Sequence, residues 1–112
     1  MILVAFCAAL LAQNLSCAQT PFAPFKAPEI AVSNWLTPNP PQKTDLIGRP
    51  YVIEFWASWC PPCQQSVKHM IDLQNRYAKE GLIIMAFAQD SSSEKVLSYI
   101  AQRSINYNVA MD

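Results

Sequence analysis

The sequence lacks an excess of charge of either sign. Its 112 residues carry eight Lys and Arg and eight Asp and Glu, and charged residues make up only 14% of the chain. No basic field is present to bind nucleic acid, and no acidic tail is present. The hydrophobic fraction of 52% is too high for a disordered chain, and the length suits one domain. Composition therefore predicts a single folded domain without a nucleic-acid partner.

A membrane-spanning apolar run is also missing. Residues 2–12 are all apolar, but a spanning helix needs about 20 residues. Such a short run fits the hydrophobic part of an export signal, and small residues follow it. We therefore predict a signal peptide over residues 1–18. A lipoprotein signal with a lipidated Cys17 and an uncleaved anchor remain alternatives, although Asn14 stands where a lipoprotein signal usually has an apolar residue.

Proline is absent after Pro62, and seven of the nine prolines lie between Pro21 and Pro50. Residues 19–28 are predicted to form an extended, Pro-rich linker, and residues 29–112 the domain. A short edge strand is expected around residues 30–35.

Apolar and helical patterns alternate through the rest of the domain. The first strand is apolar on both faces, so it is predicted to be central and covered on both sides. This order is typical of an α/β fold with a largely parallel sheet. The predicted elements are a strand over 51–57, a helix over 61–79, a strand over 82–88, a helix ending near 103 and a strand over 107–111.

Local signals mark where these helices begin and end. Gly81 follows the first helix as a stop signal, and Ser91 with Glu94 predicts a capping box at the start of the second. The apolar face of the second helix is predicted to consist of Val96, Leu97, Ile100 and Ala101.

Only two of the four cysteines, Cys60 and Cys63, lie in the domain. A close pair outside the cytoplasm indicates redox chemistry or metal binding. Cys60 ends a strand, and the following helix offers its N-terminal partial charge and amides to a thiolate. We expect Cys60 to attack and the more buried Cys63 to act second. Pro61 and Pro62 suit a helix start but remove amide donors near the sulfur.

Other uses of the pair remain as alternatives. Attachment of c-type haem needs His after the second Cys, where Gln64 stands. Structural zinc needs two further ligands, and His69, the only His, lies well around the helix and is expected on its surface. Copper binding and an inert disulfide also remain open.

Glu54 lies within the apolar strand, six residues before Cys60. A buried carboxylate is costly, and burial raises the pKa of a carboxyl group. A protonatable carboxylate beneath the thiols would take the proton from Cys63 when that sulfur attacks. The alternative is a Glu that reaches solvent at a sheet edge.

Several residues around the motif are candidate substrate contacts. Trp59, Pro61 and Pro62 are the predicted substrate-binding residues, although Trp59 is a candidate for packing in the core or over the site as well. Trp56 is expected to pack beside the site. Weaker candidates for touching substrate are Asp90, Gln64 and Gln65.

The stretch 52–63, VIEFWASWCPPC, resembles the thioredoxin superfamily. Within it, the chain is most similar to the TlpA-type exported thiol–disulfide oxidoreductases, with a redoxin-like (AhpC/TSA-like) domain. The resemblance implies an α/β, three-layer thioredoxin-like sandwich with a mixed, mainly parallel central sheet. It assigns Cys60 as nucleophile, Cys63 as resolving cysteine and Glu54 as the buried carboxylate, although many TlpA-type members have an uncharged residue at the last position.

The resemblance also implies partners and a location. We expect no cofactor or metal beyond the redox-active disulfide, protein disulfides outside the cytoplasm as substrates, and a membrane thiol electron donor. The expected location is the bacterial periplasm or the outer face of the membrane. Cytochrome c maturation is a family role, and apocytochrome cysteine pairs are candidate substrates.

The chain departs from the family pattern after its last predicted strand. The family continues with a loop bearing a Pro, usually cis, then a strand pair and a final helix, so we interpret the chain as truncated at its C-terminus. The rival functions are a copper-handling or non-catalytic binding module and a peroxiredoxin-like peroxidase. Ala57 argues against the peroxidase, which usually has Thr or Ser three residues before the Cys.

Overall fold

The computed structural model describes residues 26–112. The predicted export signal and most of the Pro-rich linker lie outside the described residues. Within residues 26–112, no helix is both long and apolar enough to cross a membrane.

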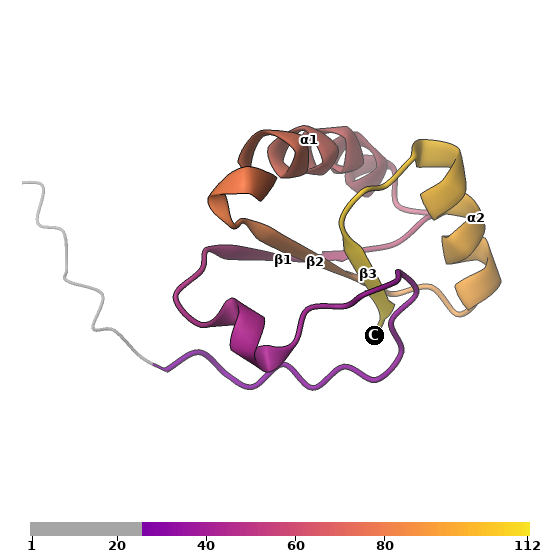
Figure 1. Cartoon of the computed structure of the whole chain (residues 1–112). Helices are drawn as coiled ribbons and strands as arrows, with labels where there is room; N and C mark the ends of the chain where they lie inside the picture. The colour runs from indigo at the N-terminus through magenta and orange to yellow at the C-terminus, as the bar shows by residue number, and fades with distance from the viewer. Residues whose placement is uncertain (1–25) are drawn as a thin grey trace, which may run out of the picture.

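Three parallel strands form the sheet, in the order β1 (Tyr51–Trp56), β2 (Ile83–Ala88) and β3 (Asn108–Met111) (Figure 1). Helix α1 (Pro61–Tyr77), extended by the 3₁₀ turn η2 (Ala78–Glu80), connects the first two strands, and α2 (Ser93–Arg103) connects the last two. The predicted order of strands and helices is therefore confirmed.

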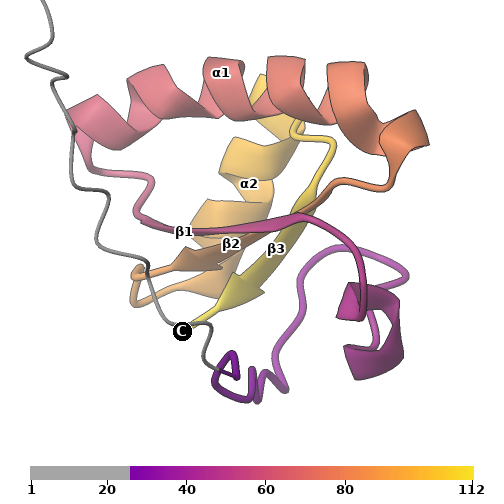
Figure 2. The ribbon, with the colours of Figure 1, turned by 90° about the vertical axis from the view of Figure 1, so that its left-hand side faces the viewer.

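Both helices cover the same face of the sheet. Because each crossover moves one strand further in the same direction, right-handed connections place α1 and α2 on one side. Figure 2 shows α1 running above the strands, with α2 behind β3. The core between them is formed by buried side chains of all five elements: Trp56, Val67, Ile84, Ala86, Ala88, Val96, Tyr99 and Val109, together with Tyr107 just before β3.

Residues 26–47, with the 3₁₀ turn η1 (Lys43–Leu46), cover part of the other face (Figure 2). Met85, Phe87 and Ala110 form the buried centre of this layer, and apolar side chains of the segment pack on them. The predicted edge strand around residues 30–35 is limited to one antiparallel bridge between Trp35 and Ala110. The expected parallel sheet is confirmed: both strand pairs are parallel, and the antiparallel bridge at Trp35 lies outside the named strands.

Within residues 26–112, the first strand is neither central nor covered on both sides, contrary to the prediction. Within the described residues β2 is central, and β1 pairs only with β2 along one edge. Ile53 is 38% exposed and Phe55 is 63% exposed. Their side chains point away from the helices, where Phe55 contacts only the margin of the second layer through Phe87, at 5.5 Å between ring centroids. An apolar strand cannot by itself tell which of its faces is covered.

The start and buried face of α2 also differ from the prediction. Ser92, not Ser91, caps the helix, and its hydroxyl accepts a hydrogen bond from the Lys95 amide at 3.5 Å. Leu97 and Ala101 are exposed, whereas Tyr99 is buried beside Trp56. Counted from Val96, the buried face of α2 follows the i, i+3 and i+4 spacing of a helix, and Tyr99 occupies the i+3 position.

Candidate redox site

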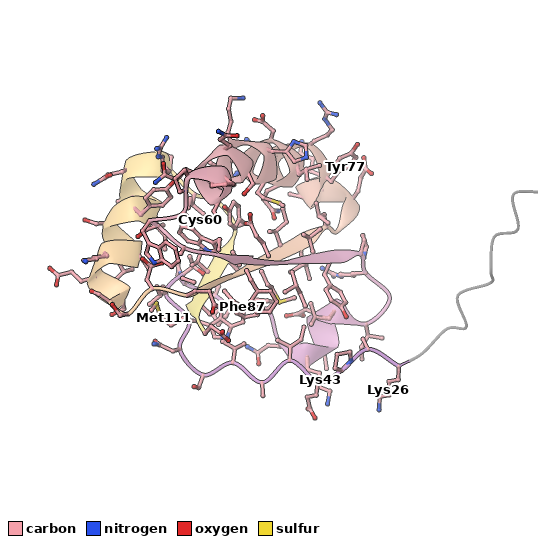
Figure 3. All side chains as sticks on the ribbon, turned by 180° about the vertical axis from the view of Figure 1, so that it is seen from behind. Lys26, Lys43, Cys60, Tyr77, Phe87 and Met111 are labelled. Carbon is pink, nitrogen blue, oxygen red and sulfur yellow. A yellow bond between two sulfur atoms is a disulfide. The ribbon has the colours of Figure 1, made fainter. Side chains whose placement is uncertain are left out.

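The cysteine pair lies at the carboxyl ends of the parallel strands. Cys60 is the N-cap residue of α1, and Figure 3 shows it at the end of this helix opposite to Tyr77. Cys60 and Cys63 form a disulfide, with their Cα atoms 5.2 Å apart. The Cys63 amide donates to Cys60 Sγ at 3.4 Å. An amide of the first helical turn is therefore placed where it stabilises negative charge on that sulfur.

The two sulfurs have different surroundings. Both cysteines are half-buried, but Cys63 packs against the core, next to the apolar face of α1. Cys60 is flanked by Trp59, which is 70% exposed, and by the exposed Pro61 and Pro62. These three exposed side chains flank Cys60, where a docking substrate would meet them. Their role as substrate contacts stays a prediction.

Glu54 lies on β1 and reaches α1 through a serine. Its Oε1 lies 2.6 Å from the Ser66 hydroxyl, which is 2.8 Å from the Cys63 carbonyl oxygen. A hydroxyl has one proton and donates to one of these oxygens at a time. Ser66 thus has two hydrogen-bond arrangements, one in which it donates to Glu54 and one in which it donates to the Cys63 carbonyl.

Among residues 26–112, four buried side-chain polar atoms, one of them in Glu54, lack a hydrogen-bond partner. Glu54 Oε2, Trp56 Nε1 and the hydroxyls of Tyr99 and Tyr107 have no hydrogen-bond partner among the described residues. Burial raises the pKa of Tyr107 above its usual value, and the negative charges of Glu54 and Tyr99 add to the effect. The core on this face of the sheet therefore contains several buried polar atoms.

Asp90 and Gln64 converge on Ser58, in the loop between β1 and α1. Asp90, only 8% exposed, accepts hydrogen bonds from both the amide and the hydroxyl of Ser58. The Gln64 side chain donates to the Ser58 carbonyl at 2.9 Å. Within the described residues these two candidates thus bond to the chain itself. Sequence reasoning missed Ser58, since a single serine in a loop carries no signal.

The remaining candidates lie apart from this network. Gln65 and His69 are exposed on α1, as expected for His69. Among residues 26–112, no group of three or more His, Cys, Asp and Glu side chains could hold a metal ion. A cavity of about 790 Å³ lies between residues 26–47 and the sheet, and no residue of the cysteine motif lines it. Figure 3 places Lys26 and Lys43, which line it, on the side of the sheet away from α1.

The chain is similar in sequence to known proteins. The model of the AhpC/TSA family matches residues 24–112. The thiol-disulfide oxidoreductase ResA of a Bacillus cereus strain is 31% identical over 68 residues, covering 61% of this chain and 39% of that protein. ResA of Oceanobacillus iheyensis is 32% identical over 71 residues, covering 63% of this chain and 37% of that protein. The chain thus spans less than half the length of these curated relatives.

Solved structures match in the same way. A putative thiol:disulfide interchange protein DsbE from Chlorobium tepidum has a TM-score of 0.58 and 33% identity, covering 62% of this chain and 49% of that chain. The thioredoxin domain of the Bacteroides vulgatus thiol-disulfide oxidoreductase BVU-2223 has a TM-score of 0.63 at 18% identity, covering 72% and 58%. The second match concerns the fold alone. Together they confirm the thioredoxin-like fold.

Proposed function

Because this chain belongs to the AhpC/TSA family and has a thioredoxin-like fold, we propose that it is an exported thiol–disulfide oxidoreductase that reduces protein disulfides. The observation that carries the proposal is the Cys60–Cys63 disulfide, with Cys60 capping α1 beside exposed side chains. Cys60 lies beside exposed side chains, and Cys63 packs against the core. Thiol–disulfide exchange uses one sulfur that meets the substrate and a second that resolves the mixed disulfide.

The reaction begins with the pair as a dithiol. The Cys60 thiolate attacks one sulfur of a substrate disulfide, that bond breaks, and the leaving substrate thiolate takes up a proton. A mixed disulfide now joins Cys60 to the substrate. Cys63 loses its proton and attacks Cys60 Sγ, which releases the second substrate thiolate and closes the Cys60–Cys63 bond. Two electrons have passed to the substrate, and a second proton has reached it.

Glu54 is the proposed acceptor for the Cys63 proton. Ser66 connects it to the helical turn of Cys63. The two hydrogen-bond arrangements of Ser66 suit a carboxyl that is protonated in one step and ionised in the next. Transfer to Glu54 avoids moving the proton through the apolar part of the core.

The biological setting belongs to the same proposal. The named relatives are thiol-disulfide oxidoreductases, and this chain covers 39% of the first of them. We expect export to the periplasm or to the outer face of the membrane. A membrane thiol donor should regenerate the dithiol, and the substrates should be disulfides of exported proteins. Reduction of apocytochrome cysteine pairs in cytochrome c maturation is the specific role we propose.

Trapping the intermediate tests this function. The full chain with Cys63→Ser, incubated as the thiol with a disulfide-containing protein, should accumulate a mixed disulfide through Cys60, visible on a non-reducing gel and by mass. Cys60→Ser should give none through Cys63 when the linked cysteine is mapped by peptide mass. Equal trapping by both variants, or by neither, would contradict the proposed roles. Stoichiometric Cu(I) binding without turnover of any disulfide would instead support a copper-handling module.

A further inference from the structure

Ser58 is held at each of its polar groups by another part of the chain. Its amide donates to Asp90 Oδ2 at 3.0 Å, and its hydroxyl donates to Asp90 Oδ1 at 2.5 Å. Its carbonyl accepts from Gln64 Nε2 at 2.9 Å. Asp90 is buried, and a buried carboxylate is retained only where hydrogen bonds replace its hydration. Both of its oxygens bond to the same serine.

These bonds connect the two halves of the redox site. Ser58 lies two residues before Cys60, and the Cys60 amide closes a turn onto the Ala57 carbonyl at 3.2 Å. Gln64 directly follows Cys63 in α1. Asp90 comes from the loop after β2, far away in sequence. The loop that carries Cys60 is therefore fixed to the helix that carries Cys63 and to the central strand of the sheet.

We propose that Asp90 is a positioning residue of the redox site, which acts through Ser58 to hold the Cys60 loop in place for disulfide formation. The inference rests on the proposed thiol–disulfide function. Fixing the loop raises the effective concentration of one cysteine sulfur at the other, since fewer conformations separate them. The hydrogen bonds of Asp90 and Gln64 to Ser58 therefore favour the intramolecular disulfide over the dithiol.

The equilibrium between the Cys60–Cys63 disulfide and glutathione buffers tests the proposal in the full chain. Asp90→Asn places an amide donor against the donors of Ser58, and Ser58→Ala removes one donor without changing charge. Both should shift the equilibrium about tenfold towards the dithiol, a potential about 30 mV higher. Ser58→Thr, which keeps the hydroxyl, should behave like the unsubstituted chain.

Asp112→Asn is the matched control for charge. Asp112 is an exposed carboxylate just after β3 that accepts from the Gln89 side chain at 2.6 Å, so its removal changes net charge without touching Ser58. It should leave the redox equilibrium unchanged.

The outcomes separate positioning from its rivals. Lower thermal stability in both variants with an unchanged redox equilibrium would show a purely structural role and overturn the proposal. A shift in Asp112→Asn as large as that in Asp90→Asn would show a charge effect and overturn it as well. If the unsubstituted cysteines never exchange with glutathione, the proposed function itself fails, which is a different result from unchanged variants of an active chain.

Discussion

Replacing Glu54 by Gln is the sharpest test of the proton-transfer step. Gln has the same shape and keeps an oxygen that can accept from Ser66, so packing in the core should hardly change. It cannot take up a proton at neutral pH. In the mechanism we propose, the first attack, by Cys60, does not use this carboxyl, whereas the resolving attack by Cys63 does. The substitution therefore separates the two steps of the reaction.

The structure suggests the size of the effect. General-base groups typically contribute about 10²- to 10⁴-fold to the rate. Glu54 is connected to the turn of Cys63 through the Ser66 hydroxyl, at 2.6 Å from the carboxyl and 2.8 Å from the Cys63 carbonyl. Because no direct contact with the sulfur carries the proton, we expect the lower end of the range. Resolution should slow by about 10²-fold, or ~2.7 kcal/mol of activation free energy.

Stopped-flow fluorescence provides the assay. Trp56 is buried and Trp59 exposed, and both lie beside the disulfide, so their emission should follow its formation. The reduced full chain is mixed with excess disulfide substrate, and the fast formation and slower resolution of the mixed disulfide are fitted separately. Glu94→Gln, an exposed carboxylate on α2, is the control. An unchanged resolution rate in Glu54→Gln, with the fold intact, would refute the proposed role of Glu54.

Three further predictions concern stability and the hydroxyl groups of the core. Ser66→Ala leaves Glu54 without its hydrogen-bond partner and should lower the free energy of unfolding by about 1–3 kcal/mol at pH 7, measured by urea titration; no loss would contradict the contact. Folding raises the pKa of Tyr107, so the contribution of its neutral form to the free energy of unfolding is fully present below the pKa of the unfolded chain, near 10. Above that pH the free energy of unfolding should fall by about 1.4 kcal/mol per pH unit. Tyr107→Phe should reduce that alkaline slope, and an identical slope would count against it. Ile84→Ala should cost about 2–5 kcal/mol because Ile84 is fully buried, whereas Ile53→Ala, on the exposed face of β1, should cost less than about 1 kcal/mol; equal losses would mean that both faces are covered in solution.

The sequence predicts well what local pattern determines. Pro61 after an apolar strand and Gly81 with a φ of 90° mark the ends of α1 to within a few residues of the prediction. The reaction class also follows from a local motif. The position of β1 in the sheet does not, because its apolar side chains look the same whether one or both faces are covered. The error at Ser91 has a similar cause, since three successive serines offer equally good caps and packing of Tyr99 selects Ser92.

The parts of the site that sequence reasoning missed are those formed by distant contacts. Ser58 and Ser66 are small polar residues with no distinctive spacing, and each becomes important only when a carboxylate from another element reaches it. Asp90 was considered as a substrate contact because it follows a strand, but burial turns both of its oxygens towards the main chain and hydroxyl of Ser58.

The chemistry of the site has two parts, one carried by the local cysteine motif and one by contacts between distant residues. Cys60 and Cys63 lie within one turn of helix, so any chain that presents this turn at a strand end can undergo disulfide exchange. Within the described residues, the carboxylates of Glu54 and Asp90 hydrogen-bond to serines rather than to either sulfur. In our proposals, Glu54 accepts the Cys63 proton and Asp90 holds the Cys60 loop in place. The cysteine motif would then set the type of reaction, and long-range contacts would set its rate and its equilibrium. Substitutions at Glu54 should therefore change mainly the rate of resolution, and substitutions at Asp90 mainly the redox equilibrium.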